Sequence, residues 1–415
     1  MNEIERMIQE LCPDGVEFRK LGEVAKCHSG ATPKTTNKEY WEGGTIPWMN
    51  SGEVNLGRVF STQKFITPLG YNSCSTKMVP AHTVVVALAG QGKTRGTVAI
   101  TEIELCTNQS LCAIEVNSNL LNSYFLWHYL RGQYNTLRRI SSGDGTRGGL
   151  NQDMIRNFEI PVPPMEVQRK IVEILDKFTE LEAELEAELE ARRKQYEYYR
   201  NKLLTFTPPD RQDLRWCSLG DVATIKGRIG FRGYTRKDLV EAHKGAISLS
   251  PSNIQNGILN LESCTYISWA KYEESPEIMA EVGDIIFTKT ASVGKTALIK
   301  SLTEKATINP QLVLLKELKC DALYLTHVMQ ASSFQNEVRK ITGIGSVPNV
   351  PQRALAEIKI PLPPIAEQRR IAAILDNFEA LTNSLQDGLP AEIAARRQQY
   401  EYYRDKLLTF PRKTA

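Results

Sequence analysis

The sequence predicts an α+β protein in which two mixed α/β domains are joined by a long antiparallel coiled-coil pair of helices, with an internal pseudo-twofold. A long segment occurs twice: residues 160–206 begin IPVPPMEVQRKIVEILDKF, and residues 360–410 begin IPLPPIAEQRRIAAILDNF. A shorter echo opens each half, LGEVA at 21–25 and LGDVA at 219–223. The globular stretches before the long repeats differ in sequence. The two halves of the chain therefore share their helical segments and differ in their globular domains.

The repeats divide the 415 residues into two globular domains and two helical segments, which is ordinary for a chain of this length. We place the first domain at 1–160 and the first helical segment at 161–208. The second domain follows at 209–360, and the second helical segment ends the chain at 361–415. The first residues, MNEIERMIQEL, are charged and predict a short amphipathic helix.

Each helical segment begins after a pair of prolines that ends a short strand, FEIPVPP in the first copy and IKIPLPP in the second. Apolar residues then recur at steps of three and four, which predicts a helix of about 40 residues, about 60 Å long, with one narrow apolar stripe. In the first copy the stripe is Ile171, Ile174, Phe178, Leu181, Leu185, Leu189, Tyr196, Tyr199 and Leu203. In the second it is Ile371, Ile374, Phe378, Leu381, Leu385, Leu389, Ile393, Tyr400, Tyr403 and Leu407.

So narrow a stripe on so long a helix needs a partner, and the second copy supplies the same stripe. We therefore expect the two segments to pair, and the alternative is that each packs only on its own domain. The candidates for pairing or for partner contact are Ile171, Phe178, Leu185, Tyr199, Ile371, Phe378, Leu385 and Tyr403. In QYEYYR, the side chains of Tyr196, Tyr198, Tyr199 and Arg200 are expected to pack between helices or to contact a partner protein.

The two helical copies differ in their middles. Residues 181–191 read LEAELEAELEA, a tetrapeptide repeat of strong helix formers, and each copy of four residues adds about 6 Å to a helix. The second segment has LQDGLPAEIAA instead, where Gly388 and Pro390 predict a break or kink. Two interpretations of the tetrapeptide remain open: it sets a separation, or it only solvates a helix face.

The globular domains match each other element by element. We expect strands at 83–89 and 98–101 in the first domain and at 284–288 and 297–299 in the second. Helices are expected at residues 124–131 and 323–330. The intervening loops also correspond, as in ALAGQGKTRGTVAI and FTKTASVGKTALI, and they are rich in Asn, Gln, Lys, Arg, Ser and Thr.

These polar side chains are the ones that read base edges and hold phosphates. Our candidates for DNA contact are Asn50, Ser51, Gln91, Lys93, Thr94, Arg95, Asn108, Gln109, Ser250, Ser252, Asn253, Lys289, Thr290, Ser292 and Lys295. The alternative is that such loops are ordinary surface turns. Asn309 and Gln311 are expected either to join the candidates or to brace the loops from within.

Composition and failed motifs exclude several classes of protein. The net charge of +3 neither demands nor excludes nucleic acid. The longest apolar run is too short to span a bilayer, and the eight scattered cysteines are expected to be reduced and buried. Gly92-Lys93-Thr94 and Gly294-Lys295-Thr296 lack the upstream glycine of a P-loop, since the chain has Ala87 and Lys289 there. No catalytic or metal-ligand pattern stands out, so we assign no catalytic residue and no metal.

The repeats resemble the conserved regions of the specificity subunit of type I restriction-modification systems. The resemblance rests on IPxPPxxxQRxI, ILDxF and QYEYYRxKLLTF, and it covers nearly the whole chain. The variable domains resemble the two target recognition domains of that family, and the tetrapeptide run resembles the spacer repeats of one of its branches. The copies here read EAEL where that branch tends to TAEL.

The resemblance implies a cytoplasmic, non-catalytic subunit that reads the two halves of a bipartite, asymmetric double-stranded DNA site. It implies as partners two modification (methyltransferase) subunits and restriction (motor-nuclease) subunits, and no membrane. It also implies that the chain binds no cofactor, whereas S-adenosylmethionine, ATP and magnesium belong to the partner subunits. From the residues alone, a coiled-coil adaptor that binds proteins without DNA specificity remains the alternative, and a stand-alone enzyme would need motifs that are absent.

Overall fold

The computed structural model describes residues 3–90, 93–141, 149–206, 214–228, 233–343, 345, 347–383 and 388–413. The chain divides into two compact units. Unit 1 is Met1–Glu184 with Ala394–Ala415, and unit 2 is Leu185–Ile393. Each unit therefore combines one globular domain with parts of both helical segments. Within the described residues, no helix is both long enough and apolar enough to cross a membrane.

Unit 1 contains two sheets and a two-stranded ribbon. The five-stranded sheet has the order β2-β10-β7-β8-β4, the four-stranded sheet has the order β5-β3-β9-β6, and β1 pairs with β11. The strands are β1 (Phe18–Lys20), β2 (Ala25–Ser29), β3 (Ile46–Met49), β4 (Arg58–Val59), β5 (Lys64–Ile66), β6 (Met78–Val79), β7 (Val84–Ala87), β8 (Val98–Thr101), β9 (Leu105–Thr107), β10 (Leu111–Val116) and β11 (Glu159–Pro161). The helices that begin in it are α1 (Glu3–Leu11), α2 (Leu21–Val24), α3 (Pro68–Asn72), α4 (Ser123–Gly132), α5 (Tyr134–Ile140), α6 (Gln152–Arg156) and α7 (Met165–Leu204).

Unit 2 repeats this plan. Its sheets have the orders β13-β23-β20-β21-β17-β16 and β14-β18-β15-β22-β19, and β12 pairs with β24. The strands are β12 (Arg215–Ser218), β13 (Thr224–Gly227), β14 (Leu239–Val240), β15 (Ala246–Leu249), β16 (Ile254–Gln255), β17 (Ile258–Leu259), β18 (Thr265–Ile267), β19 (Met279–Ala280), β20 (Ile285–Thr288), β21 (Thr296–Leu298), β22 (Ala306–Ile308), β23 (Leu312–Lys316) and β24 (Lys359–Leu362). The helices are α8 (Leu219–Val222), α9 (Trp269–Glu273), α10 (Ala322–Gln330), α11 (Ser332–Ile341), α12 (Gln352–Glu357), α13 (Ile365–Asn383) and the start of α14 (Leu389–Leu407).

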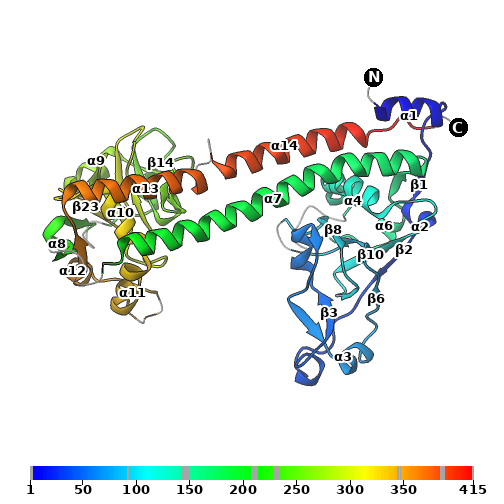
Figure 1. Ribbon diagram of the computed structural model, residues 1–415, viewed down its shortest axis with the longest axis horizontal. Helices are drawn as coiled ribbons and strands as arrows, with labels where there is room; N and C mark the ends of the chain where they lie inside the picture. The colour runs from blue at the N-terminus through cyan, green and yellow to red at the C-terminus, as the bar shows by residue number, and fades with distance from the viewer. Residues whose placement is uncertain are drawn as a thin grey trace. The chain divides into compact units, whose positions relative to one another are not determined.

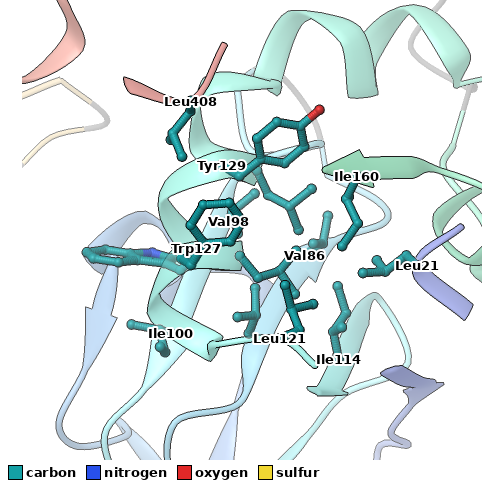
Figure 2. Close-up of a cluster of buried hydrophobic side chains, with 14 of the residues drawn as sticks. Leu21, Val86, Val98, Ile100, Ile114, Leu121, Trp127, Tyr129, Ile160 and Leu408 are labelled. Carbon is teal, nitrogen blue, oxygen red and sulfur yellow. The ribbon is translucent and has the colours of Figure 1, made fainter. Parts of the chain in front are cut away.

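The core of unit 1 lies between its five-stranded sheet and α4. Strands β7 and β8 are fully buried and supply Val86, Val98 and Ile100, which pack near Trp127 of α4 (Figure 2). The end of the chain completes this core, because Leu408 joins the same cluster. The first domain therefore buries apolar surface contributed by the distant C-terminal segment, which ties the helical repeat to it.

The structure confirms most of the predicted elements and corrects two expectations. The predicted strands correspond to β7, β8, β20 and β21, and the predicted helices correspond to α1, α4 and α10. A helix begins at Leu389 just after Gly388, which confirms the predicted interruption, while residues 384–387 lie outside the described part. The expectation that all cysteines are buried is wrong: all eight are free, but only Cys27, Cys106 and Cys112 are buried. The other five are half-buried, and Cys12, Cys217, Cys264 and Cys320 pack against the cores.

The helix α7 is continuous over 40 residues and includes the tetrapeptide run, as predicted. The predicted stripe is not buried along its whole length, however. Ile171 and Ile371 are fully buried against their domains, whereas Leu181 and Leu381 are exposed. The reason is that Ile171 and Ile371 belong to the domain cores, as do Tyr196 and Tyr400 farther along the stripes, whereas Leu181 and Leu381 lie outside those cores.

Candidate nucleic-acid interface and its helical frame

Aromatic side chains pair the helices in each unit. In unit 1, Phe178 of α7 stacks on Tyr403 of α14, with ring centroids 5.3 Å apart (Figure 1 shows α14 alongside α7). In unit 2, Tyr199 of α7 stacks on Phe378 of α13 at 5.6 Å. Both pairs join equivalent positions of the two repeats. Pairing of the two helical segments is therefore confirmed, and these four candidates lie in it.

The pairing in unit 1 is antiparallel. Phe178 of α7 contacts Tyr403 of α14, and Glu182, four residues later on α7, forms an ion pair with Arg397, six residues earlier on α14. The two helices therefore run in opposite directions. Leu185 is half-buried, and Leu385 lies outside the described residues. In both QYEYYR copies the middle tyrosine, Tyr198 or Tyr402, is the most exposed of the three, and its stacked neighbour, Tyr199 or Tyr403, is also partly exposed.

A buried histidine links each globular domain to its helices. In unit 1, Nδ1 of His128 contacts the hydroxyl of Tyr400 and Nε2 contacts Oδ1 of Asp176, each at 2.9 Å. Burial lowers the pKa of His128, so the ring is neutral, donates to Asp176 and accepts from the tyrosine. In unit 2, Nδ1 of His327 lies 3.1 Å from the hydroxyl of Tyr196, the equivalent tyrosine. Sequence reasoning missed both histidines, although each lies in a predicted helix.

A buried glutamine fixes the start of each helical segment. The carbonyl oxygen of the Gln168 side chain accepts from the backbone N–H of Asn122 at 2.8 Å, and its amide donates to the carbonyls of Pro163 and Leu120. Gln368 accepts from the backbone N–H of Asp321 at 2.9 Å and donates to Pro363 at 2.7 Å. The repeated glutamine of the motif thus anchors the start of the helical segment to the residues that precede α4 or α10.

The candidate DNA loops converge in each unit because of the strand pairing beneath them. In unit 1, β3 and β9 are parallel neighbours, and the loops after Met49 and Thr107 start side by side. In unit 2, β15 and β22 are also parallel neighbours, with Leu249 beside Ile308. The carboxyl ends of adjacent parallel strands meet at one edge of a sheet, so these loops are brought together.

The hairpin loop between the two central strands joins the same group. In unit 1 the backbone N–H of Leu88 donates to Ser110, and in unit 2 that of Lys289 donates to Gln311. The ammonium of Lys295 donates to the carbonyl of Pro251 at 3.2 Å, which ties the hairpin to the loop after β15. The three predicted loops therefore form one cluster in each unit.

The predicted contact residues fall into three groups by exposure. The exposed ones are Lys93, Gln109, Ser252, Ser292 and Lys295. The half-buried ones are Asn50, Ser51, Thr94, Asn108, Ser250, Lys289 and Thr290. The buried ones are Arg95 and Asn253, and Gln91 lies outside the described residues. The exposed group offers the most accessible side chains, although Lys295 also donates to the carbonyls of Pro251 and Ile254 and Gln109 accepts from Thr32.

Several candidates also hold the loops in shape. The side chain of Asn50 accepts from the backbone N–H of Gly52 and donates to Glu53, and Glu53 accepts from the backbone N–H of Asn50. Asn253 occupies the place of Glu53 in unit 2, where its oxygen accepts from the backbone N–H of Ser250 and its amide donates to the carbonyl of Asn260. Asn253 is buried, so it braces the turn.

The Asn-Gln pairs after β9 and β22 form equivalent turns. Asn108 accepts from the backbone N–H of Ser110 at 3.0 Å, and Asn309 accepts from that of Gln311 at 2.9 Å. The bracing alternative for Asn309 is therefore confirmed, and Asn108 braces its loop in the same way. Two further candidates lie in the hairpin loop of unit 2. Burial lowers the pKa of Lys289. The hydroxyl of Thr290 donates to the side chain of Asn349 at 2.8 Å.

One group of potential metal ligands occurs among the described residues. Nitrogen or oxygen atoms of His327, Asp376 and Glu379 lie within 4.8 Å of one another in unit 2. The sequence analysis did not single out these residues, since they are far apart in the chain and lack the spacing of a metal motif.

Comparison with known proteins agrees with this architecture. Residues 13–191 and 215–395 match the family described as "Type I restriction modification DNA specificity domain". The specificity subunit of the type I restriction enzyme EcoR124I/EcoR124II from Escherichia coli is 30% identical over 417 residues, which covers 96% of this chain and 95% of that protein. A putative type I restriction enzyme specificity subunit from Haemophilus influenzae is 31% identical over 307 residues, covering 70% of this chain and 73% of that protein.

Two solved structures share the fold. One, from a study of complex assembly and conformational transition of the type I R-M system, has a TM-score of 0.61 at 18% identity and covers 95% of this chain and 97% of its own. The other, the S subunit of a type I restriction-modification system from M. genitalium, has a TM-score of 0.55 at 15% identity and covers 95% and 96%. Because the matched domains span most of both units, this chain belongs to the family of type I restriction-modification DNA specificity subunits.

Proposed function

We propose that each unit of this specificity subunit reads one half of a bipartite, asymmetric DNA target. As a member of its family, the chain recognises a DNA target sequence and organises the complex, and it has no catalytic role. This membership removes the adaptor interpretation that the residues alone left open. The observation that carries the proposal is that three polar loops cluster at equivalent positions in both units.

The differences between the equivalent loops support an asymmetric target. The first unit offers Lys93 and Gln109 at its exposed positions, whereas the second offers Ser252, Ser292 and Lys295. Lysine pairs with the acceptor edge of guanine, glutamine with adenine, and serine with either edge or with phosphate. Two clusters of different chemistry on one backbone plan suit two different half-sites.

The equivalence of the two units supports docking of two copies of a modification subunit. The chain acts with DNA and with the methylase and restriction subunits of its system. Each unit repeats the same stacked aromatic pair and the same anchored glutamine, so it offers the same frame to a partner. We propose that S-adenosylmethionine, ATP and magnesium are bound by these partners, and that the chain works in the cytoplasm, where its DNA target is found.

The experiment that tests the proposal is a map of methylated adenines in a methylation-free host. The host expresses this chain together with the modification subunit of its system, and each protein alone serves as control. We expect a two-part motif with a fixed gap only when both are present. If the two proteins associate and remain soluble but no motif appears, the proposal is wrong.

Single loop variants assign each half-site to a unit. We expect Lys93→Ala to weaken or relax the half-site read by unit 1 and to leave the other half unchanged, and Lys295→Ala to do the converse. A lost phosphate contact would lower the salt slope of binding by about one instead of relaxing sequence preference. The matched control is Lys177→Ala, since Lys177 is an exposed lysine on α7 that pairs only with Glu173 among the described contacts.

A further inference from the structure

The buried histidines His128 and His327 occupy equivalent positions in the two units but form different hydrogen bonds. In unit 1, Nε2 of His128 contacts Asp176 at 2.9 Å, and the residue one turn later on α7 is Thr179. In unit 2 the equivalent residues are His327, Asp376 and Glu379. Asp376 instead forms an ion pair with Lys300 at 2.6 Å. Unit 2 therefore has the carboxyl of Glu379 where unit 1 has the hydroxyl of Thr179. The hydrogen bond between histidine and aspartate that unit 1 has is not formed between His327 and Asp376.

Without that hydrogen bond, one ring nitrogen of His327 has no partner. The ring is fully buried, its Nδ1 contacts the hydroxyl of Tyr196, and its Nε2 has no hydrogen-bond partner in the described structure. In unit 1 the nitrogen opposite the tyrosine is the one that faces the aspartate. Because Nδ1 of His327 already contacts Tyr196, we infer that Nε2 is the nitrogen left for the group formed with Asp376 and Glu379. A buried imidazole nitrogen without a partner is costly, so the site favours a ligand that satisfies it.

The ligand atoms of these three side chains lie close enough to converge on one ion. They are within 4.8 Å of one another. Around a tetrahedral zinc ion, nitrogen and oxygen ligands lie about 3.3 Å apart, as follows from bond lengths of about 2.0–2.2 Å. Closing the difference requires the Asp376 and Glu379 side chains to rotate toward His327, with the Asp376 carboxylate shared between the ion and Lys300.

The surroundings of the cluster suit a cation. Glu379 is buried, and burial raises the pKa of its carboxyl to about 7, against the opposing effects of Lys300, Arg200 and a hydrogen bond with Gln330. Burial lowers the pKa of His327 to about 4, which keeps the imidazole neutral and able to coordinate. Glu379 also lines an open cavity of about 720 Å³ together with Arg200 and Gln330, which gives an ion a route from solvent.

We propose that His327, Asp376 and Glu379 form a binding site for a divalent transition-metal ion, for which zinc is the best chemical match. One imidazole and two carboxylates are borderline-soft and hard ligands that suit Zn²⁺, and three protein ligands leave one position for water. Tyr196 supplies the second-shell hydrogen bond on the other ring nitrogen, as is usual for metal-bound histidines. The ion joins α10 to α13 and so replaces the direct histidine–aspartate bond of unit 1.

The experiment measures zinc binding by the full chain after removal of metal with a chelator. We expect isothermal titration with ZnCl₂ to give one site that is lost or weakened at least ten-fold by Glu379→Gln and by His327→Gln. Glu379→Gln keeps the volume of a buried side chain and is the variant to rely on if His327→Gln fails to fold. The control is His128→Gln, the equivalent change in unit 1, which should leave zinc affinity unchanged.

Cobalt distinguishes this site from the free cysteines. Co²⁺ bound by imidazole and carboxylates gives weak visible bands and no intense thiolate band in the near ultraviolet, whereas binding at the eight cysteines would give the latter. With zinc at about a hundred times its Kd, we also expect the Tm of unit 2 to rise by about 5–10 °C in the wild type and not in Glu379→Gln. No zinc binding by the wild type, or binding that Glu379→Gln leaves unchanged, would overturn the proposal.

Discussion

Gln168 and Gln368 place polar atoms where the sequence pattern would suggest only the start of an amphipathic helix. Both side chains are buried, and each bonds backbone groups on both sides of a domain–helix junction. A glutamine that satisfies an otherwise unpaired backbone N–H in a buried place carries more free energy than an exposed one. The junction between recognition domain and helix is therefore fixed by hydrogen bonds as well as by apolar packing.

We expect Gln168→Ala to lower the free energy of unfolding by about 2–3 kcal/mol, because three hydrogen bonds are lost and the Asn122 N–H is left unpaired. Urea unfolding followed by circular dichroism measures this. Gln9→Ala, at an exposed glutamine of α1, serves as control and should change the free energy by less than about 0.5 kcal/mol. Equal effects of the two substitutions would contradict the anchoring role.

His128 makes stability depend on pH. Burial lowers its folded-state pKa below the usual 6.5, so the unfolded chain binds the proton more readily. Stability is then fully present above pH 6.5 and falls as pH drops from there toward the lowered folded-state pKa. We expect His128→Gln to be less stable at pH 8 and to lose less stability between pH 7 and pH 5 than the wild type. Parallel pH profiles from urea unfolding would show that His128 does not contribute.

The sequence indicated which polar residues lie in the loops but not how they hold the loops in shape. Asn253 and Asn108 were selected as candidates for base or phosphate contact, and the structure shows that both brace turns, because an Asx side chain readily bonds nearby backbone in a turn. His128 was missed because a single histidine in an apolar helix carries no spacing signal, and its partners Asp176 and Tyr400 come from distant segments. Long-range partners of this kind become visible only when the chain is folded.

The helical elements were predictable almost to their ends because their pattern is long and repeated. The Pro-Pro entries, the continuous α7 and the start of α14 after Gly388 all follow from local rules of helix initiation and termination. What the pattern could not show is which part of each stripe is buried. Leu175 and Leu375 are fully buried although they lie outside the predicted stripes, since both belong to the domain cores.

The stacked aromatic pairs should contribute measurably to helix pairing. A double-mutant cycle of Phe178→Ala and Tyr403→Ala is expected to give a coupling free energy of about 0.5–1.5 kcal/mol, and Tyr199→Ala with Phe378→Ala should give a similar value. Urea unfolding of the single and double variants provides the four values. As control, Tyr198→Ala should couple to Phe378→Ala by less than about 0.3 kcal/mol, because Tyr198 is exposed and touches Tyr199 instead.

The two units of the molecule are built on one plan from interleaved parts of the chain. Unit 1 takes its globular domain from the first half and its second helix from the last residues, whereas unit 2 is formed from the middle. Duplication of one unit followed by changes in its loops accounts for both features. The helical segments stay nearly identical, and the loops proposed to read DNA differ between the units. The helix α7 is the continuous element that belongs to both units, so its length is the simplest variable that a change of sequence can act on.

The tetrapeptide run lets that length be changed without altering local chemistry. Residues 182–185 and 186–189 both read EAEL, so deletion of either copy gives the same protein and keeps an EAEL after Leu181. The helix shortens by about 6 Å and its remaining part turns by about 40°. We expect the gap in the methylated motif to shorten by about one base pair, since base pairs rise about 3.4 Å along the duplex and not all of the 6 Å projects onto the DNA axis.

The measurement is the same map of methylated adenines, made with the deletion variant and with Glu186→Gln, which keeps the length and removes one charge. The two half-sites should stay the same in both variants, because the loops that we propose to read them are untouched. Glu186→Gln should also keep the wild-type gap. If the deletion variant still methylates DNA with an unchanged gap, the tetrapeptide run only solvates a helix face and the spacing is set elsewhere in the molecule.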